Sequence, residues 1–212
     1  MTPSSTACAA IVLAAGSSTR FGANKLLQPF RGGCVLGAVL AAATAARARP
    51  LVIVTGHAAA AVTAAIEGAL GDDVPYALVH NPEHASGEMA SSIKVGVAWL
   101  LANAPRAQGA LVVPGDMPLL SAAVMDRVAA AGGAAGIAAP RHRGQRGHPV
   151  YFGRAVWPEV LALRAGAQMR ALLAARAEAI RWVDVDDPGI LVDVDTPEAL
   201  RAAERGDYSA FS

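Results

Sequence analysis

The sequence predicts an α/β fold with three layers, a mainly parallel β-sheet between two layers of helices. Short apolar runs that suit strands alternate along the chain with longer segments that suit helices, the order typical of parallel sheets. The apolar runs are also continuous, as strands covered on both faces require. With 212 residues, 54% of them hydrophobic, the chain is long enough to bury one such core.

The first part of the chain supplies the regular alternation. We expect its strands at Ala9–Leu13, Leu51–Thr55, Tyr76–His80, Ala110–Val113 and Gly136–Ala139. We expect its helices at Val35–Arg47, Ala59–Leu70, Met89–Asn103 and Ser121–Ala131. Because such connections place successive strands parallel, the carboxyl ends of these strands should meet at one edge of the sheet.

The alternation breaks after Pro140, where a polar and basic loop covers residues 141–148. Beyond this loop we expect strands at Pro149–Phe152, Arg181–Val185 and Ile190–Val194, and helices at Val156–Arg164, Met169–Ala177 and Pro197–Arg205. Residues 207–212 are expected to fray. Since no linker or repeat interrupts the chain, residues 1–212 are expected to form a single domain.

Composition excludes several classes of partner. A net charge of +1 provides no broad basic surface for nucleic acid. No apolar run reaches the length of a membrane-spanning helix, and no positive charge precedes the apolar residues 7–15, so neither a membrane anchor nor a signal peptide is expected. Cys8 and Cys34 lack metal-type spacing and suit reduced core residues. These features favour the cytoplasm.

A loop rich in glycine and hydroxyl side chains follows the first expected strand. It begins Leu13-Ala14-Ala15-Gly16-Ser17-Ser18 and continues to Arg20 and Lys25. Free backbone N–H groups with two cations suit an anion of high charge density, such as a triphosphate. The spacing fits neither the Walker A loop nor the dinucleotide fingerprint. The alternative is an ordinary turn with a solvated arginine and lysine.

Further polar residues fall at the ends of the later strands. Gly56 follows the second strand, and Asn81, Gly87 and Ser91 follow the third. Asp116 follows the fourth strand within Gly-Asp-Met-Pro, and a carboxylate there suits Mg²⁺, which prefers one or two carboxylates together with phosphate oxygens. Asp116 as a plain turn or helix cap is the alternative.

A second acidic cluster, Asp193-Val194-Asp195, precedes the expected last helix. Alternation would place Asp193 and Asp195 on the same side of an extended strand. Thr196-Pro197 is a natural helix start, so a carboxylate here could complement the helix dipole.

The segment LAAGSSTRFGANKLLQPF, from Leu13 to Phe30, resembles the signature of the nucleotidyltransferases that make dinucleotide forms of the molybdenum cofactor. The molybdenum cofactor cytidylyltransferases are the most similar branch, and the resemblance extends along nearly the whole chain. It implies a Rossmann-like fold of the nucleotide-diphospho-sugar-transferase type. It also implies Mg²⁺-dependent transfer of CMP from CTP to a molybdopterin-type phosphate, with release of pyrophosphate. Ala15, where the guanylyl branch resembles Leu-Ala-Gly-Gly, favours CTP over GTP.

The resemblance also assigns roles within the chain. It makes residues 7–140 the nucleotide-binding half and residues 141–205 the acceptor-binding and closing segment. The implied catalytic residues are Arg20, Lys25 and Asp116, and the implied metal ligands are Asp116 and Asp195, with Asp193 in reserve. The implied nucleotide-binding residues are Leu13, Ala14, Ala15, Gly16, Ser17, Ser18, Arg20, Lys25, Gly56, Asn81, Gly87 and Ser91. The implied acceptor-binding residues are His148, Arg146 and Arg170, although His148 could equally be a structural loop residue.

One position departs from the family pattern. The family motif Gly-Asp-x-Gly-Ala-Arg corresponds here to Ala165-Gly166-Ala167-Gln168-Met169-Arg170, so Ala167 replaces an acidic residue. Two alternatives therefore stay open: a cytidylyltransferase for another small phosphorylated acceptor, and a non-catalytic accessory protein that delivers cofactor to a molybdoenzyme of the xanthine dehydrogenase type. A nicotinamide-dependent oxidoreductase is disfavoured by the missing fingerprint.

Overall fold

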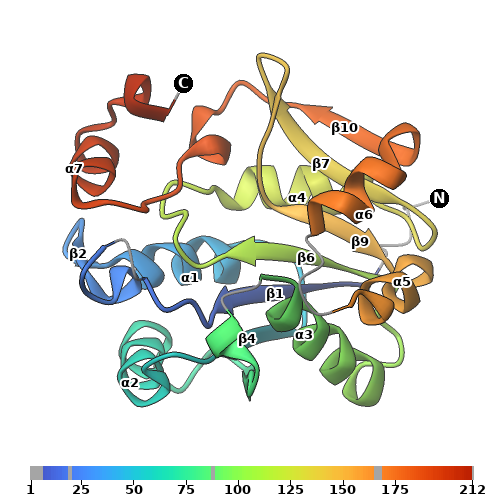
Figure 1. Ribbon diagram of the computed structural model, residues 1–212, viewed down its shortest axis with the longest axis horizontal. Coiled ribbons are helices and arrows are strands. Elements are labelled where there is room, and N and C mark those ends of the chain that lie inside the picture. Colours follow the sequence, from blue (N-terminus) through green and yellow to red (C-terminus); the bar gives the residue numbers. More distant parts are fainter. Residues whose placement is uncertain (1–6, 19–20, 87–88, 165–168, 212) are drawn as a thin grey trace.

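A computed structural model describes residues 7–18, 21–86, 89–164 and 169–211. It confirms the α/β prediction, with one central sheet in the order β10-β7-β9-β6-β1-β4-β5 and β8 paired to β7 (Figure 1). The strands of this sheet are β1 (Cys8–Ala14), β4 (Leu51–Thr55), β5 (Tyr76–His80), β6 (Gly109–Pro114), β7 (Ile137–His142), β8 (Gln145–Arg146), β9 (Val150–Gly153) and β10 (Ile180–Asp184). A separate hairpin joins β2 (Pro29–Phe30) and β3 (Gly33–Cys34).

Most neighbouring strands of the sheet are parallel. β1 lies between β4 and β6, β5 extends this block beside β4, and all of these pairs are parallel. Strand β9 runs antiparallel to both β6 and β7, while β10 returns parallel to β7. The central strands are buried along almost their whole length, which explains their continuous apolar sequences.

Helices cover both faces of the sheet. Helices α1 (Val35–Ala45), α2 (Ala59–Leu70) and α4 (Ala122–Ala131) bury their apolar residues in one core cluster. Helices α3 (Met89–Asn103), α5 (Trp157–Ala162) and α6 (Met169–Ala175) pack into a second cluster on the other face. Single 3₁₀ turns connect several elements: η1 (Lys25–Leu27), η2 (His84–Ser86), η3 (Arg154–Val156) and η4 (Ala177–Ala179). No helix of the described segments is long and apolar enough to cross a membrane.

A third, smaller apolar cluster lies under helix α7 (Pro197–Arg205). Figure 1 shows this helix beyond the end of the sheet toward which the arrow of β6 points, the carboxyl edge of the parallel strands. Phe30, Val192, Val194 and Leu200 are among the buried members of the cluster. The last helix and the β2–β3 hairpin are therefore packed together beside the edge where ligands bind in open α/β sheets.

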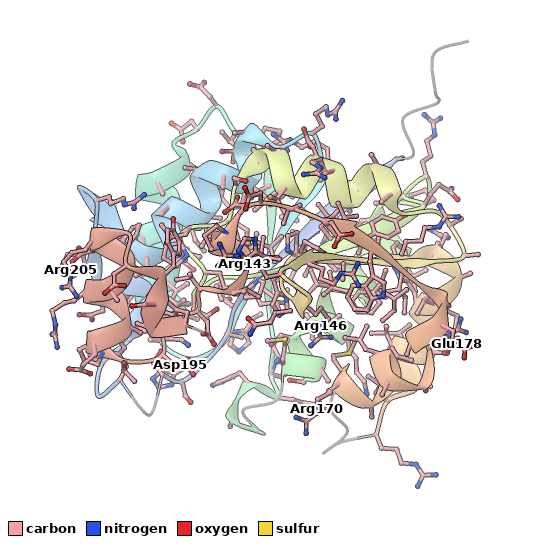
Figure 2. All side chains as sticks on the ribbon, turned by 90° about the horizontal axis from the view of Figure 1, so that it is seen from above. Arg143, Arg146, Arg170, Glu178, Asp195 and Arg205 are labelled. Atoms are coloured by element: carbon pink, nitrogen blue, oxygen red, sulfur yellow. The ribbon has the colours of Figure 1, made fainter. Side chains whose placement is uncertain are left out.

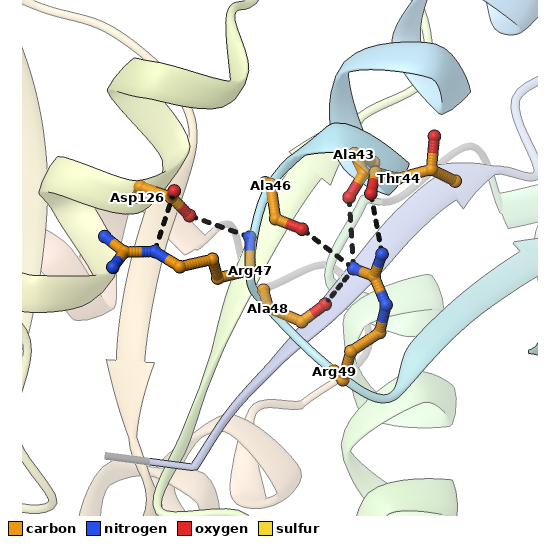
Figure 3. Close-up of polar contacts among 7 residues, drawn as sticks. All are labelled: Ala43, Thr44, Ala46, Arg47, Ala48, Arg49 and Asp126. Carbon is orange, nitrogen blue, oxygen red and sulfur yellow. Dashed lines mark hydrogen bonds and ion pairs between the residues drawn. The ribbon is translucent and has the colours of Figure 1, made fainter. Parts of the chain in front are cut away.

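At the opposite, amino edge of the sheet, an arginine donates hydrogen bonds to the end of helix α1. Helix α1 ends two residues before the expected Arg47, and the Arg49 guanidinium donates hydrogen bonds to backbone carbonyls at this end (Figure 3). The acceptors are Ala43, Thr44, Ala46 and Ala48. The last carbonyls of a helix have no intrahelical donor, so a cation here satisfies them.

Three sequence-based expectations for the second half were wrong. Residues 141–148 are not simply a loop, because Arg143 and Gly144 both have positive φ (48° and 85°) and form the turn of a β7–β8 hairpin. Ile190–Val194 is not a strand: η5 (Pro188–Leu191) occupies its start, with the Asp187 carboxylate accepting from the Gly189 N–H at 2.9 Å. The tail is not simply frayed, since η6 (Tyr208–Phe211) places Phe211 against the third cluster.

Candidate active site

The glycine-rich loop leaves β1 at the carboxyl edge and is tied to its neighbours by backbone hydrogen bonds. The Leu13 carbonyl accepts from the Gly115 N–H at 2.9 Å, and the Ala15 carbonyl accepts from the His57 N–H at 3.1 Å. A Cβ on Gly115 would lie 2.5 Å from the Leu13 oxygen, so only glycine allows this approach. The loop is thereby held against the ends of β4 and β6.

Lys25 begins the 3₁₀ turn η1 directly behind this loop. The Asn24 side chain caps the turn by accepting from the Leu26 N–H at 3.1 Å, and the Lys25 N–H donates to the Ser18 hydroxyl at 3.2 Å. These contacts fix the lysine backbone beside the loop and leave its side chain to extend across the edge of the sheet.

The Lys25 ammonium lies between two carboxylates. Its Nζ is 2.6 Å from Oδ2 of Asp116 and 2.5 Å from Oδ1 of Asp195. The three residues come from separate parts of the chain, namely η1, the end of β6 and the segment before α7. The structure therefore brings together the residues predicted as a catalytic cation and two metal ligands.

Asp195 reaches this position through the irregular segment that replaces the expected strand. The Val194 N–H donates to the Asp116 carbonyl at 3.0 Å, which joins the two acidic segments directly. The Thr196 hydroxyl then caps α7 by accepting from the Ala199 N–H at 3.1 Å. Thr196 thus caps the helix, and Asp195 is not needed for that role.

The charges at this edge are strongly coupled. Burial alone would lower the pKa of Lys25, but the attraction of Asp116 and Asp195 raises it above the ordinary value, so the amine is charged at neutral pH. Partial burial raises the pKa of Asp193, and repulsion from Asp195 and Asp116 adds to this effect. The site therefore carries an excess of negative charge that a further cation would relieve.

A cavity of about 420 Å³ lies over these groups, within the size range of small-molecule sites. Its lining includes predicted residues from the loop and the acidic segments: Leu13, Ala15, Gly16, Ser17, Ser18, Lys25, Asp116 and Asp195. It also includes Asp193, the reserve candidate, Ser92, which adjoins the predicted Ser91, and side chains that the sequence-based assignment missed: Phe21, His84 and Met89. Their only sequence signal was their place just after the first and third strands.

The structure gives Asn81 a different place from the one expected. This side chain is fully buried and donates to the Ser91 and Ser92 hydroxyls at 2.9 and 3.0 Å, while its Oδ1 accepts from the Glu83 N–H. This geometry does not support direct contact between the Asn81 amide and a nucleotide. Asn81 instead fixes the turn that presents His84 and the start of α3 to the cavity.

Gly56 and Ala14 were predicted to bind the nucleotide but do not line the cavity. Both are buried, and a Cβ on Gly56 would lie 2.5 Å from Cβ of His84 and 2.8 Å from Cβ of Ala15. Gly56 therefore permits the close packing of η2 on the glycine-rich loop. The predicted Arg20 and Gly87, like Ala167, lie outside the described residues.

The expected acceptor residues lie apart from the cavity lining. Arg146 and Arg170 are exposed, on β8 and α6. In Figure 2 they lie between Glu178 at one end of the molecule and Asp195 and Arg205 toward the other. His148 Nδ1 is buried without a hydrogen-bond partner among the described residues. Burial lowers the pKa of His148 to about 4, the Arg146 charge acts in the same direction, and Asp116 opposes both.

The donor atoms at the edge fit a hard divalent cation. Two carboxylates already share one cation, Lys25, and Mg²⁺ characteristically takes one or two carboxylates and completes its shell with phosphate oxygens and water. No group of three histidine, cysteine, aspartate or glutamate residues within the described segments could hold a metal alone. Asp116 and Asp195 thus suit a metal that arrives with a phosphate ligand.

Comparisons with known proteins find relatives that cover nearly the whole chain. The molybdenum cofactor cytidylyltransferase of Escherichia coli K12 is 25% identical over 92% of this chain and 94% of its own length. The crystal structure of Rv0371c from Mycobacterium tuberculosis H37Rv has a TM-score of 0.79 and 32% identity, covering 95% of this chain and all of that chain. A manganese complex of the same mycobacterial protein has a TM-score of 0.74 and 30% identity, covering 94% and 99%.

The family is shown by a match over most of the chain. Residues 10–180 match the MobA-like NTP transferase domain, and this range includes the glycine-rich loop, Lys25 and Asp116. The chain therefore belongs to the MobA-like NTP transferase family and is a nucleotidyltransferase by descent.

Proposed function

We propose that this protein transfers CMP from CTP to a phosphate group of a molybdopterin-type acceptor and releases pyrophosphate, with Mg²⁺ as cofactor. The observation that carries the proposal is the Lys25, Asp116 and Asp195 group facing the glycine-rich loop across one cavity. A triphosphate needs amide donors, a cation and a metal site within a few ångströms of each other, and these residues supply all three.

The loop would hold the triphosphate. Gly16, Ser17 and Ser18 line the cavity, and backbone N–H groups of such a loop bind phosphate oxygens. Lys25 would pair with the β- and γ-phosphates as a point charge, together with Arg20, which can bind two oxygens at once. Asp116 and Asp195 would hold the metal, which when bound neutralises the phosphates and polarises the α-phosphoryl group.

The reaction requires positioning more than proton transfer. A phosphate oxygen of the acceptor forms a bond to the α-phosphorus of CTP while the bond to the β-phosphate oxygen breaks, and both electrons leave with pyrophosphate. The acceptor oxygen is already ionised at neutral pH, so no general base is needed. The protein would align two anions and stabilise the charge that moves onto pyrophosphate.

The second half of the chain would bind the acceptor. Arg146 and Arg170 are exposed cations, and both would suit an anionic ligand. His148 would present a neutral imidazole near Asp116, because its pKa is about 4. The proposed setting is the cytoplasm, where a molybdoenzyme could receive the product.

Pyrophosphate release tests the proposal. The protein is incubated with Mg²⁺ and CTP, with or without molybdenum cofactor, and with GTP as a competitor. We expect release that depends on the acceptor and on Mg²⁺, with CTP preferred. A preference for GTP would overturn the base assignment. Tight CTP binding without turnover on any phosphorylated acceptor would instead support the accessory role.

A further inference from the structure

The position of the Lys25 ammonium is that of a cation shared by two carboxylates. Its distances of 2.6 and 2.5 Å to Asp116 and Asp195 place one oxygen of each carboxylate against the same nitrogen. Oxygens that both touch one ammonium could ligate one Mg²⁺ after a small inward movement, since Mg²⁺–oxygen bonds are about 2.1 Å long. An ammonium group and a divalent cation cannot both occupy this position, because they would overlap and repel each other.

The surroundings explain why some cation must be there. Among the described residues, the cavity is lined by three aspartates, Asp116, Asp193 and Asp195, and by a single lysine, Lys25. Without a cation between them, the Asp116 and Asp195 carboxylates would repel each other in a partly buried place. Lys25 therefore stabilises the edge of the sheet when no metal is bound.

The attachment of Lys25 allows its side chain to leave. Its backbone is fixed by the Ser18 hydroxyl and by the turn that Asn24 caps, while the ammonium is held only through a flexible four-carbon stem. The same backbone position lies beside the glycine-rich loop, where a triphosphate would bind. The ammonium can thus exchange carboxylate oxygens for phosphate oxygens without any change of fold.

We infer that Lys25 is a built-in placeholder cation, which occupies the metal position between Asp116 and Asp195 until a divalent cation displaces it. This inference rests on the proposed function, because it takes these two carboxylates as metal ligands. It follows that metal binds weakly to the protein alone and more tightly once a triphosphate draws the ammonium away. By linkage, metal and triphosphate then strengthen each other's binding by the same factor.

Mn²⁺ binding without nucleotide tests the inference directly. The free Mn²⁺ concentration is followed by electron paramagnetic resonance for the wild-type protein and for Lys25→Met. We expect Lys25→Met to bind Mn²⁺ at least about tenfold more tightly, because the competing state is removed. Lys94→Met is the matched control: Lys94, the other lysine of the chain, donates to the Leu163 carbonyl and does not line the cavity. Its Mn²⁺ affinity should equal that of the wild type.

The outcomes separate this inference from the proposed function. Equal or weaker Mn²⁺ binding by folded Lys25→Met overturns the placeholder role, even if the wild type binds Mn²⁺ together with CTP. The metal assignment and the proposed function both fail if the wild type, even with CTP present, binds Mn²⁺ no better than Asp116→Asn does.

A second measurement needs no variant. The wild-type protein is treated with an amine-acylating reagent at limiting dose, and the acylation of Lys25 is compared with that of Lys94 by peptide mass spectrometry. Displacement by Mn²⁺ frees the Lys25 amine from its two carboxylates, so its acylation should increase several-fold relative to Lys94. An unchanged or reduced ratio at saturating Mn²⁺ would show that the ammonium stays in place and would contradict the inference.

Discussion

The two edges of the sheet each hold a cation among several oxygen atoms, but they hold it differently. At the amino edge, Arg49 is surrounded by the carbonyls that end helix α1 (Figure 3). At the carboxyl edge, Lys25 lies between two carboxylates over an open cavity. The carbonyls around Arg49 are neutral backbone groups of the fold, whereas carboxylates are charged side chains that can exchange one cation for another. The first arrangement is structural, and the second is suited to binding.

The same contrast separates two aspartates. Asp126 of α4 accepts from the backbone N–H and the Nε of Arg47 at 2.8 and 2.9 Å, and so joins α4 to the end of α1. Asp116 also contacts a cation, but it follows a buried strand and faces the cavity. We therefore expect similar ion pairs to have different roles according to which edge of the sheet they occupy.

Replacing one aspartate at each edge of the sheet should give the largest difference in activity between two variants. Asp116→Asn keeps the shape of the side chain and removes the charge that would bind the metal, so we expect nucleotidyl transfer to fall by roughly 10³-fold. The melting temperature should change little. Asp126→Asn is the control, and its activity per folded molecule should equal that of the wild type. If pyrophosphate release by Asp116→Asn stays near the wild-type rate, the two edges do not differ as described.

His148 should make the stability of the protein sensitive to acid. Its folded-state pKa is about 4, below the ordinary 6.5, so the unfolded chain takes up a proton that the folded protein excludes. This contribution to stability is complete above pH 6.5 and decreases as the pH falls toward 4, by about 2 kcal/mol at pH 5. Urea unfolding of the wild type and of His148→Gln at pH 7.5 and pH 5 measures it. The variant should lose less stability on acidification, and equal losses would contradict the assignment.

Loss of Arg49 at the amino edge should affect stability alone. Arg49→Met leaves the carbonyls at the end of α1 without their donor, which should lower the free energy of unfolding by about 1–2 kcal/mol. Activity of the folded fraction should be unchanged. Denaturant titration together with pyrophosphate release checks both statements, and a loss of activity without a loss of stability would be the opposite of the expected result.

Arg47→Met should have the smallest effect. The Arg47 side chain is 81% exposed beside Asp126, and exposed ion pairs contribute about 0.5 kcal/mol or less. Its backbone N–H bond to Asp126 would survive the substitution. Thermal unfolding should therefore distinguish it clearly from Arg49→Met, and a similar destabilisation by both variants would show that the carbonyl contacts of Arg49 are not the reason for its effect.

Much of the fold could be predicted because its strands and helices differ in local pattern. The continuous apolar runs located β1, β4 and β6, which are buried on both faces, and also the partly exposed edge strand β5. Segments whose structure depends on distant contacts were harder to predict. Ile190–Val194 has an apolar sequence that suits a strand, but the Val194 N–H donates to the Asp116 carbonyl and the two valines pack into the α7 cluster.

The site could be predicted in part for the same reason. Lys25, Asp116 and Asp195 were identifiable because each follows a local signal, a glycine-rich loop, a strand end or a helix start. Their meeting depends on the order of the strands, which the sequence alone does not reveal. Asn81 had the right position along the chain, yet its amide turns inward to Ser91 and Ser92. His84 and Ser92 line the cavity without any motif of their own.

A crystal structure of the protein grown with CTP and Mn²⁺ tests the central claim most directly, because the anomalous signal locates the metal independently of the refined atoms. We expect a manganese peak bound by Asp116 and Asp195, the triphosphate on the loop from Ala15 to Ser18, and the Lys25 ammonium moved from the carboxylates to the phosphates. Manganese bound away from both aspartates, or CTP bound outside this cavity, would contradict the claim.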